Sequence, residues 1–216
     1  MIKEKDIDFL VNKMHIDINH LMTKLNSRDV VEHKKNIIDQ IHQYIRVTLL
    51  EEKRCDRINE IYSEINDSKI NSVLDSMRIA ILSFCKGGLR DLWVSQENQS
   101  WYPKIIIKEI LEPNDINTLD DISIIYRGCS ISEINNKEYG QAWTTSYMCA
   151  KEFAVEYYLN EEWFKIENRV VLEAKINKDD IYYSDQLNHE KEIVVEPSCL
   201  FDIKLFKTYK DLLDEK

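Results

Sequence analysis

Glycine is scarce in this sequence: it occurs four times in 216 residues, at positions 87, 88, 128 and 140. The nucleotide-binding turn of the Rossmann fold and the phosphate-binding P-loop both need several closely spaced glycines, which let the backbone approach phosphate. Neither turn can be assembled from these four positions. A nucleotide ligand would therefore require a different architecture.

Patterns for disulfides, metals and membranes are also missing. The cysteines at 55, 85, 129, 149 and 199 are odd in number and form no C-x-x-C pair, which favours reduced thiols. The five histidines show no ligand spacing with Cys or Asp. No apolar run approaches the roughly 20 residues of a membrane span, and the N-terminal residues lack the apolar core of a signal peptide. We therefore expect no metal, no membrane association and a cytoplasmic location.

Basic residues are outnumbered throughout, with 29 Lys+Arg against 39 Asp+Glu and a net charge of −10. The excess is largest in residues 121–216, which hold 12 basic and 19 acidic residues. Proteins that bind the phosphate backbone normally carry a basic stripe. The composition therefore favours a protein over a nucleic acid as the macromolecular partner.

Apolar periodicity predicts helices in the first part of the chain and mostly strands in the rest. The sequence is thus typical of an α+β fold, not of alternating α/β units. We divide it into a helical N-terminal region, 1–66, and a second domain, 67–216. The expected helices cover 5–26, a region from 37 to 65 that is one long helix or two, 69–86 closed by Gly87-Gly88, 100–111 opened by Ser100 and Pro103, and 150–160. The expected strands cover 122–127, 141–146, 169–176, 181–183, 191–196 and 200–206.

Three short stretches in the strand-rich part can carry chemistry. Tyr126-Arg127-Gly128 places a planar guanidinium beside backbone that a ligand can approach closely. Thr144-Thr145-Ser146 places two hydroxyls on one face of a strand and the third on the other. Glu190-Lys191-Glu192 places two carboxylates on one strand face, where each raises the other's pKa. Each stretch alone also has an ordinary structural explanation.

Taken in order, these three stretches resemble the ADP-ribosyltransferase family, in particular its R-S-E branch of bacterial toxins and arginine-specific ectoenzymes. The match covers about residues 121–205 and includes Ala150 and Phe153-Ala154 after the hydroxyl stretch. The family usually has Ser-Thr-Ser where this chain begins with Thr144, which keeps the hydroxyl and adds a methyl group. The resemblance implies a core of two small antiparallel sheets that bind NAD in the cleft between them.

The resemblance also implies roles for individual residues. Arg127 would hold the NAD phosphates or the adjoining ribose, and the Gly128 backbone would lie against the nicotinamide amide. Thr144, Thr145 and Ser146 would contact NAD, with Thr144 and Ser146 bracing the nicotinamide ribose. Glu192 would stabilise the oxocarbenium-like sugar cation. Glu190 would bind the acceptor, an arginine of a protein, and Tyr183 would contact it unless its ring faces the core.

Several alternatives remain open. An NAD glycohydrolase or a transferase acting on nucleic acid would use the same site, with Lys34-Lys35, Lys53-Arg54 and Arg57 available as a basic patch. A catalytically retired interaction module is the alternative outside the enzymes, with residues 1–66 docking an antitoxin or chaperone. Family habits favour a toxin or effector of a toxin–antitoxin, phage or phage-defence system, acting in the cytoplasm that makes it or delivered into a target cell.

Overall fold

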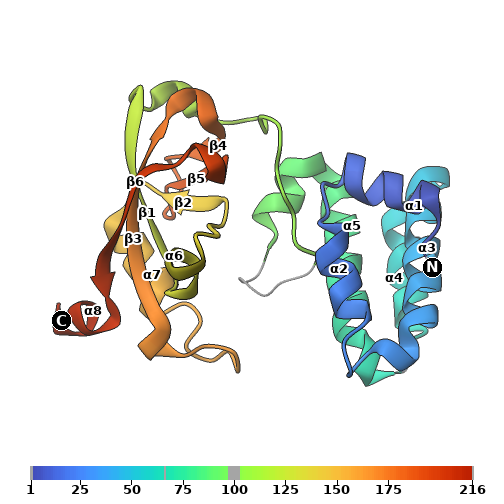
Figure 1. Cartoon of the computed structure of the whole chain (residues 1–216). Helices are drawn as coiled ribbons and strands as arrows, with labels where there is room; N and C mark the ends of the chain where they lie inside the picture. The colour runs from blue at the N-terminus through green and yellow to red at the C-terminus, as the bar shows by residue number, and fades with distance from the viewer. Residues whose placement is uncertain (1, 66, 97–102, 216) are drawn as a thin grey trace. The chain divides into compact units, whose positions relative to one another are not determined.

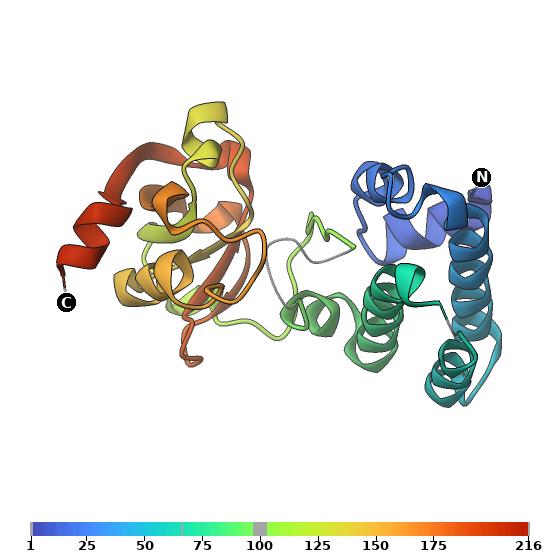
Figure 2. The ribbon, with the colours of Figure 1, turned by 90° about the horizontal axis from the view of Figure 1, so that it is seen from below.

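The chain forms two compact units, Met1–Ile106 and Ile107–Lys216, in a computed structural model of the protein (Figure 1). The structure describes residues 2–65, 67–96 and 103–215. The division at residue 66 expected from the sequence differs from this boundary. Helix α5 (Ser68–Val94) packs against α3 (Lys34–Leu50) and α4 (Arg54–Ser63), so it belongs to the helical unit (Figure 2).

The helical unit is built around fully buried side chains such as Leu10, Leu21 and Tyr44. The helix expected over 5–26 is interrupted, because His15 has a left-handed backbone (φ 53°) and Ile16 pairs with Ile105 in an antiparallel bridge. The remaining elements of this unit are α1 (Glu4–Asp8), a π-helical turn (Phe9–Lys13), α2 (Ile18–Leu25) and a 3₁₀ turn (Val31–His33).

Two expectations about helix ends need correction. The backbone of α5 leaves helical geometry at Gly87 and Gly88, as expected, but helical structure resumes and continues to Val94. The described part of the helix expected over 100–111 is not helical; residues 100–102 lie outside the described residues. Ile105 pairs with Ile16, and the Leu111 N–H donates to the Tyr182 carbonyl at 2.8 Å. The backbone groups of this segment therefore bond to residues far away in the sequence and not to each other as in a helix.

The second unit is an antiparallel sheet with helices on both faces, which confirms the α+β class. The strand order is β4-β5-β2-β1-β3-β6. The strands are β1 (Ile122–Ser130), β2 (Ala142–Thr144), β3 (Arg169–Asn177), β4 (Ile181–Asp185), β5 (Glu192–Val195) and β6 (Phe201–Thr208), and the α-helices are α6 (Ser132–Asn136), α7 (Tyr147–Val155) and α8 (Tyr209–Asp214).

The two separate sheets expected from the resemblance are joined into one. Strands β4, β5 and β2 form one three-stranded half, and β1, β3 and β6 form the other. The halves meet through a single pair of residues, Tyr126 of β1 and Thr144 of β2, whereas all three residues of β2 pair with β5. The sheet is continuous there but narrow.

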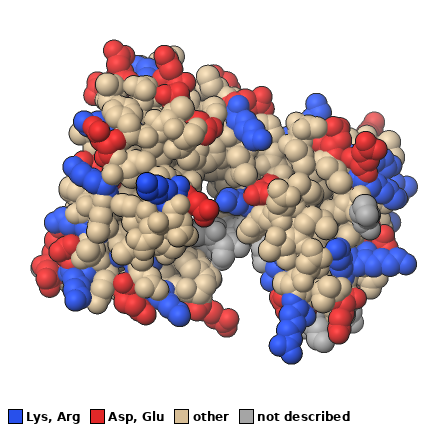
Figure 3. Space-filling view, in the orientation of Figure 1, with Lys and Arg blue, Asp and Glu red and all other residues tan. Residues whose placement is uncertain are grey.

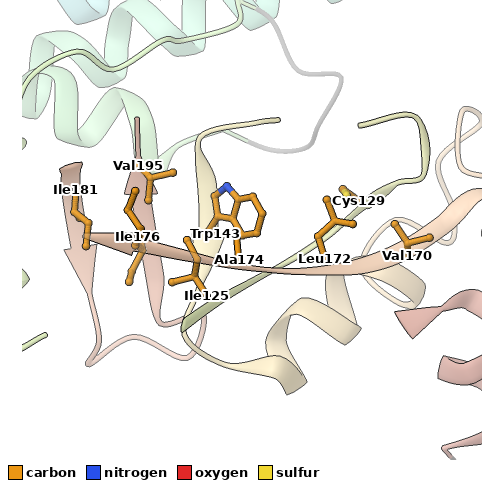
Figure 4. Packing of buried hydrophobic residues seen from close by; sticks show 10 residues of the cluster. Ile125, Cys129, Trp143, Val170, Leu172, Ala174, Ile176, Ile181 and Val195 are labelled. Carbon is orange, nitrogen blue, oxygen red and sulfur yellow. The ribbon is translucent and has the colours of Figure 1, made fainter. Parts of the chain in front are cut away.

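The two faces of this sheet have different cores. Trp143 lies among aliphatic side chains on one face, including Ile125 and Leu172 (Figure 4), and Ile134 of α6 packs against this cluster. On the other face, Ala150 and Ala154 of α7 pack with Val171 of β3. Neighbouring residues of β1 therefore face opposite cores.

Among the residues that the structure describes, no helix is long and apolar enough to cross a membrane. The same residues contain no group of three or more His, Cys, Asp or Glu side chains arranged to hold a metal ion. On the face shown in Figure 3, acidic and basic side chains are interspersed over both units.

Candidate functional site

A row of polar side chains crosses the whole sheet. Each residue is the direct partner of the next on the neighbouring strand, and partners in an antiparallel sheet project from the same face. The row brings Thr144 of the hydroxyl stretch and Glu192 of the glutamate stretch together at its centre. Its members, from β4 to β6, are Asp185, Glu192, Thr144, Tyr126, Glu173 and Lys204.

The hydroxyls of Thr144 and Ser146 fix the junction between β2 and α7. Thr144 Oγ1 accepts a hydrogen bond from the Ser146 N–H at 2.9 Å, and Ser146 Oγ accepts one from the Cys149 N–H at 3.3 Å. Ser146 is therefore the N-cap of α7. The Ser146 hydroxyl accepts in this cap, so its own O–H can donate to a ligand. Thr145 is used differently, since its hydroxyl donates to Gln186 Oε1 at 2.6 Å.

Glu190 and Glu192 do not lie on one continuous strand, which corrects the expectation from alternation. Strand β5 begins at Glu192, Glu190 lies in the preceding turn, and Lys191 between them has a left-handed backbone (φ 44°). The i, i+2 rule holds only for extended backbone. Burial raises the pKa of Glu190, and the neighbouring His189 opposes this. His189 in turn contacts Glu152 of α7 at 3.2 Å.

Both glutamates act on a common neighbour, the buried thiol of Cys149 on α7. Burial, then the negative charges of Glu190 and Glu152, raise the pKa of Cys149 to about 11, and Glu192 contributes in the same direction. A hydrogen bond with Thr144 opposes the shift. The thiol therefore stays protonated at neutral pH. Glu190, Glu192 and Thr144 all lie close enough to Cys149 to influence its pKa.

Arg127 does not present its guanidinium to this space. Its Nε and Nη2 bind the two carboxylate oxygens of Glu133 at 2.8 and 2.9 Å, and Nη1 donates to the Ala142 carbonyl at 2.6 Å. Burial by itself lowers the pKa of Arg127, but the charge and hydrogen bonds of Glu133 outweigh it and raise the pKa above its ordinary value. The Gly140 N–H also binds Glu133, at 3.1 Å. Arg127 thus joins β1 to α6 and to the start of β2.

Helix α7 packs directly against the Cα atom of Gly128 and leaves no space for a side chain. A Cβ atom at this position would lie 2.1 Å from the Ala150 carbonyl oxygen and 2.5 Å from the Ala154 nitrogen. Its carbonyl accepts a hydrogen bond from Arg169 at 3.4 Å. Glycine is required here so that β1 and α7 can approach each other. The expected approach of a ligand to the Gly128 backbone is not open on this side.

The loop between β4 and β5 exposes a different apolar residue from the one expected. Tyr183 is 1% exposed and its ring belongs to the core, which is the alternative that the sequence had left open. Leu187, in the same loop as Glu190, is 96% exposed. The alternation of β4 could have placed Tyr183 inside, but only the loop conformation shows Leu187 outside.

Sequence reasoning missed three residues that organise this region. Glu133 was not singled out, because nothing in its local sequence marks it as the partner of Arg127. Gln186 follows β4 and binds Thr145. Arg169, 2% exposed, begins β3 and donates to the carbonyls of Ala154 and Phe153, both at 3.2 Å.

No protein-family model matches this chain, and searches of curated proteins and of solved structures return no significant match. The resemblance to ADP-ribosyltransferases therefore rests on the motif residues of the sequence alone.

Proposed function

We propose that the chain is a mono-ADP-ribosyltransferase that transfers ADP-ribose from NAD to an acceptor, with release of nicotinamide. The observation that carries the proposal is the central part of the polar row, Tyr126–Thr144–Glu192. Three stretches far apart in the sequence meet on three adjacent strands.

In the proposed reaction, the bond between nicotinamide and C1′ of its ribose breaks, and nicotinamide leaves with the bonding electron pair. The ribose ring then carries positive charge. The Glu192 carboxylate stabilises that charge and accepts a hydrogen bond from the ribose 2′-hydroxyl. Fixed charges aimed at developing charge contribute strongly to catalysis. Thr144, paired directly with Glu192, and the O–H of Ser146 orient the ribose beside it.

Glu190 acts on the acceptor. An acceptor nitrogen, for which the family pattern favours an arginine side chain of a protein, forms the new bond to C1′ and gives its proton to Glu190. Burial raises the pKa of Glu190, which makes it a better proton acceptor once it is ionised. The carboxylate that binds the acceptor, Glu190, is held by a turn, and the carboxylate that binds the sugar, Glu192, is held by a strand.

Arg127 is assigned a positioning role in place of direct phosphate binding. Its Nε and Nη2 groups, which could bind a phosphate bidentately, are already bound to the Glu133 carboxylate. Its Nη1 donates to the Ala142 carbonyl and so holds the beginning of β2. Thr144 ends that same strand. Direct contact with NAD would require the buried ion pair to break.

The cellular context is proposed on the family pattern alone. An enzyme of this kind modifies a protein target in a cytoplasm, either that of its own cell or that of a cell into which it is delivered. Residues 1–66 are proposed as the docking surface for an antitoxin or chaperone.

Incubation of the purified chain and a cell lysate with labelled NAD tests the proposal. We expect labelled protein and free nicotinamide. Glu192→Gln should lower nicotinamide release by roughly 10²–10³, while the exposed control Glu138→Gln leaves it unchanged. Glu190→Gln should spare NAD hydrolysis and remove transfer. Free ADP-ribose without labelled acceptor would identify a glycohydrolase. Label that is released by nuclease would identify a nucleic-acid transferase. If no NAD were consumed, the proposal would be contradicted.

A further inference from the structure

The loop between β4 and β5 is closed by the side chain of Gln186. Its Oε1 accepts from the Thr145 hydroxyl at 2.6 Å. Its Nε2 lies 3.2 Å from Ser184 Oγ and 3.3 Å from the carbonyl oxygens of both Lys191 and Glu192. A primary amide has one carbonyl acceptor and two N–H donors. The amide of Gln186 is therefore used within the protein to join the end of β2 to β4 and β5.

These bonds converge on the peptide group that separates the two glutamates. The Lys191 carbonyl accepts from Gln186 Nε2 and also from the Thr145 N–H at 3.2 Å. Lys191 has φ 44°, a conformation that is costly for a residue with a Cβ atom and persists only where the surroundings hold it. The backbone of Lys191 sets the direction in which Glu190 leaves the chain relative to Glu192.

The start of the loop is anchored independently. The Gln186 N–H donates to Asp115 Oδ2 at 2.6 Å, and the Asp115 N–H donates to the Ser184 carbonyl at 3.1 Å. Because these two bonds fix the backbone of Gln186, they also limit the directions from which its side chain can approach the Lys191 carbonyl.

We propose that Gln186 and Thr145 form a latch that holds Lys191 in its left-handed conformation and so directs Glu190 towards the space that Glu192 faces. The inference rests on the proposed transferase function, because it assigns both residues as positioning residues for the acceptor carboxylate. It changes the expected role of Thr145 from NAD contact to support of the Glu190 turn.

Gln186→Leu and Thr145→Val test the latch, since both nearly keep side-chain volume. The first removes the side-chain bonds of Gln186, and the second removes the hydroxyl bond to Gln186 but keeps the backbone bond of Thr145 to Lys191. A small misplacement of a reacting group can cost about 10²-fold in rate. We expect each variant to lower transfer roughly tenfold to a hundredfold, while NAD hydrolysis, which does not use Glu190, changes far less. The matched control is Gln43→Leu, at an exposed position of α3, which should change neither rate.

Rescue distinguishes a latch from general support of the fold. Asparagine tolerates the left-handed conformation better than lysine. Lys191→Asn should therefore restore transfer in the Gln186→Leu background. A transfer loss that Lys191→Asn leaves unchanged, or an equal loss of hydrolysis and transfer, would overturn the latch.

A titration of the Glu190 carboxyl by NMR gives a readout that does not depend on activity. Release of the turn exposes Glu190 to water, so its pKa should fall towards the ordinary value in Gln186→Leu. An unchanged titration together with unchanged transfer would show that Gln186 does not hold Glu190. If the parent chain neither consumes NAD nor labels an acceptor, the proposed function fails. The titration then shows by itself whether Gln186 holds Glu190, because the pKa of Glu190 falls in Gln186→Leu only if it does.

Discussion

Thr144 of β2 and Glu192 of β5 lie directly opposite each other in paired strands, and Tyr126 of β1 lies on the other side of Thr144. The positions of these three residues are therefore set by backbone pairing. Glu190 is held differently, by a turn with a left-handed residue. Functional groups on strands are placed more precisely than groups on loops. The proposed ribose site is thus the rigid part, and the proposed acceptor site is the adjustable part.

Replacement of Glu190 should stabilise the protein at neutral pH. Burial raises the pKa of Glu190 above 4.5, so the native state disfavours the ionised form. The penalty is absent below the unfolded-state pKa and develops as pH rises through the native-state pKa. We expect the free energy of unfolding of Glu190→Gln to exceed that of the parent at pH 7 and to match it near pH 4. Denaturant unfolding at both pH values measures this; a gain that is larger at pH 4 would contradict it.

Removal of Arg127 alone should be strongly destabilising. The side chains of Arg127 and Glu133 are 14% and 17% exposed, so Arg127→Met leaves a mostly buried carboxylate without its partner. Such a change typically costs about 3–5 kcal/mol, whereas replacing both partners by apolar residues can be neutral. We expect Arg127→Met combined with Glu133→Leu to recover most of the loss, as measured by denaturant unfolding.

The same double variant separates the two roles for Arg127. The double variant lacks the bond to the Ala142 carbonyl, so hydrogen exchange of the β2 amides must be measured with it. If Arg127 only positions β2, NAD binding should recover to the extent that these amides regain the exchange rates of the parent. If its guanidinium holds the NAD phosphates, the KM for NAD should stay raised although the protein is folded. The second result would contradict the positioning role.

Gly128→Ala should separate α7 from β1. The added methyl group would meet backbone atoms of α7 at 2.1 and 2.5 Å, and overpacking of this kind costs about 1–3 kcal/mol or more. Hydrogen exchange of the α7 amides should become faster. Gly88→Ala is the matched control: φ is +71° and ψ is −152° there, a region that is essentially restricted to glycine, and nothing lies within 4 Å of the new Cβ, so only backbone strain of roughly 1–3 kcal/mol is added. Equal effects of the two changes on α7 would contradict the packing argument.

Leu187→Ser should lower transfer while sparing stability and NAD hydrolysis. The side chain is 96% exposed and belongs to the same loop as Glu190, so the expected change in unfolding free energy is within about 0.5 kcal/mol. Loss of one apolar contact with an acceptor should reduce transfer roughly tenfold. Asn188→Ser, at the next and also exposed position, is the control. Unchanged transfer would show that Leu187 does not contact the acceptor.

The sequence pattern located the strands well, because β6 alternates apolar and polar residues and because β3 and β5 are short β-branched apolar runs next to charged residues. It failed over residues 103–111, where the apolar run Ile105–Ile107 fits either a helix or an extended segment, and only the pairing of Ile105 with Ile16 decides between them. It also failed at Lys191, since no local pattern signals a left-handed lysine held by Gln186 and Thr145.

The sequence by itself determined the α+β order and the three stretches that can carry chemistry, because period and residue type are local properties. Only the tertiary structure decided how those stretches are used. It placed Thr144 opposite Glu192, paired Arg127 with Glu133, turned Tyr183 inward and put Glu190 in a turn. Each of these outcomes depends on partners from other elements, which strand pairing and packing bring together.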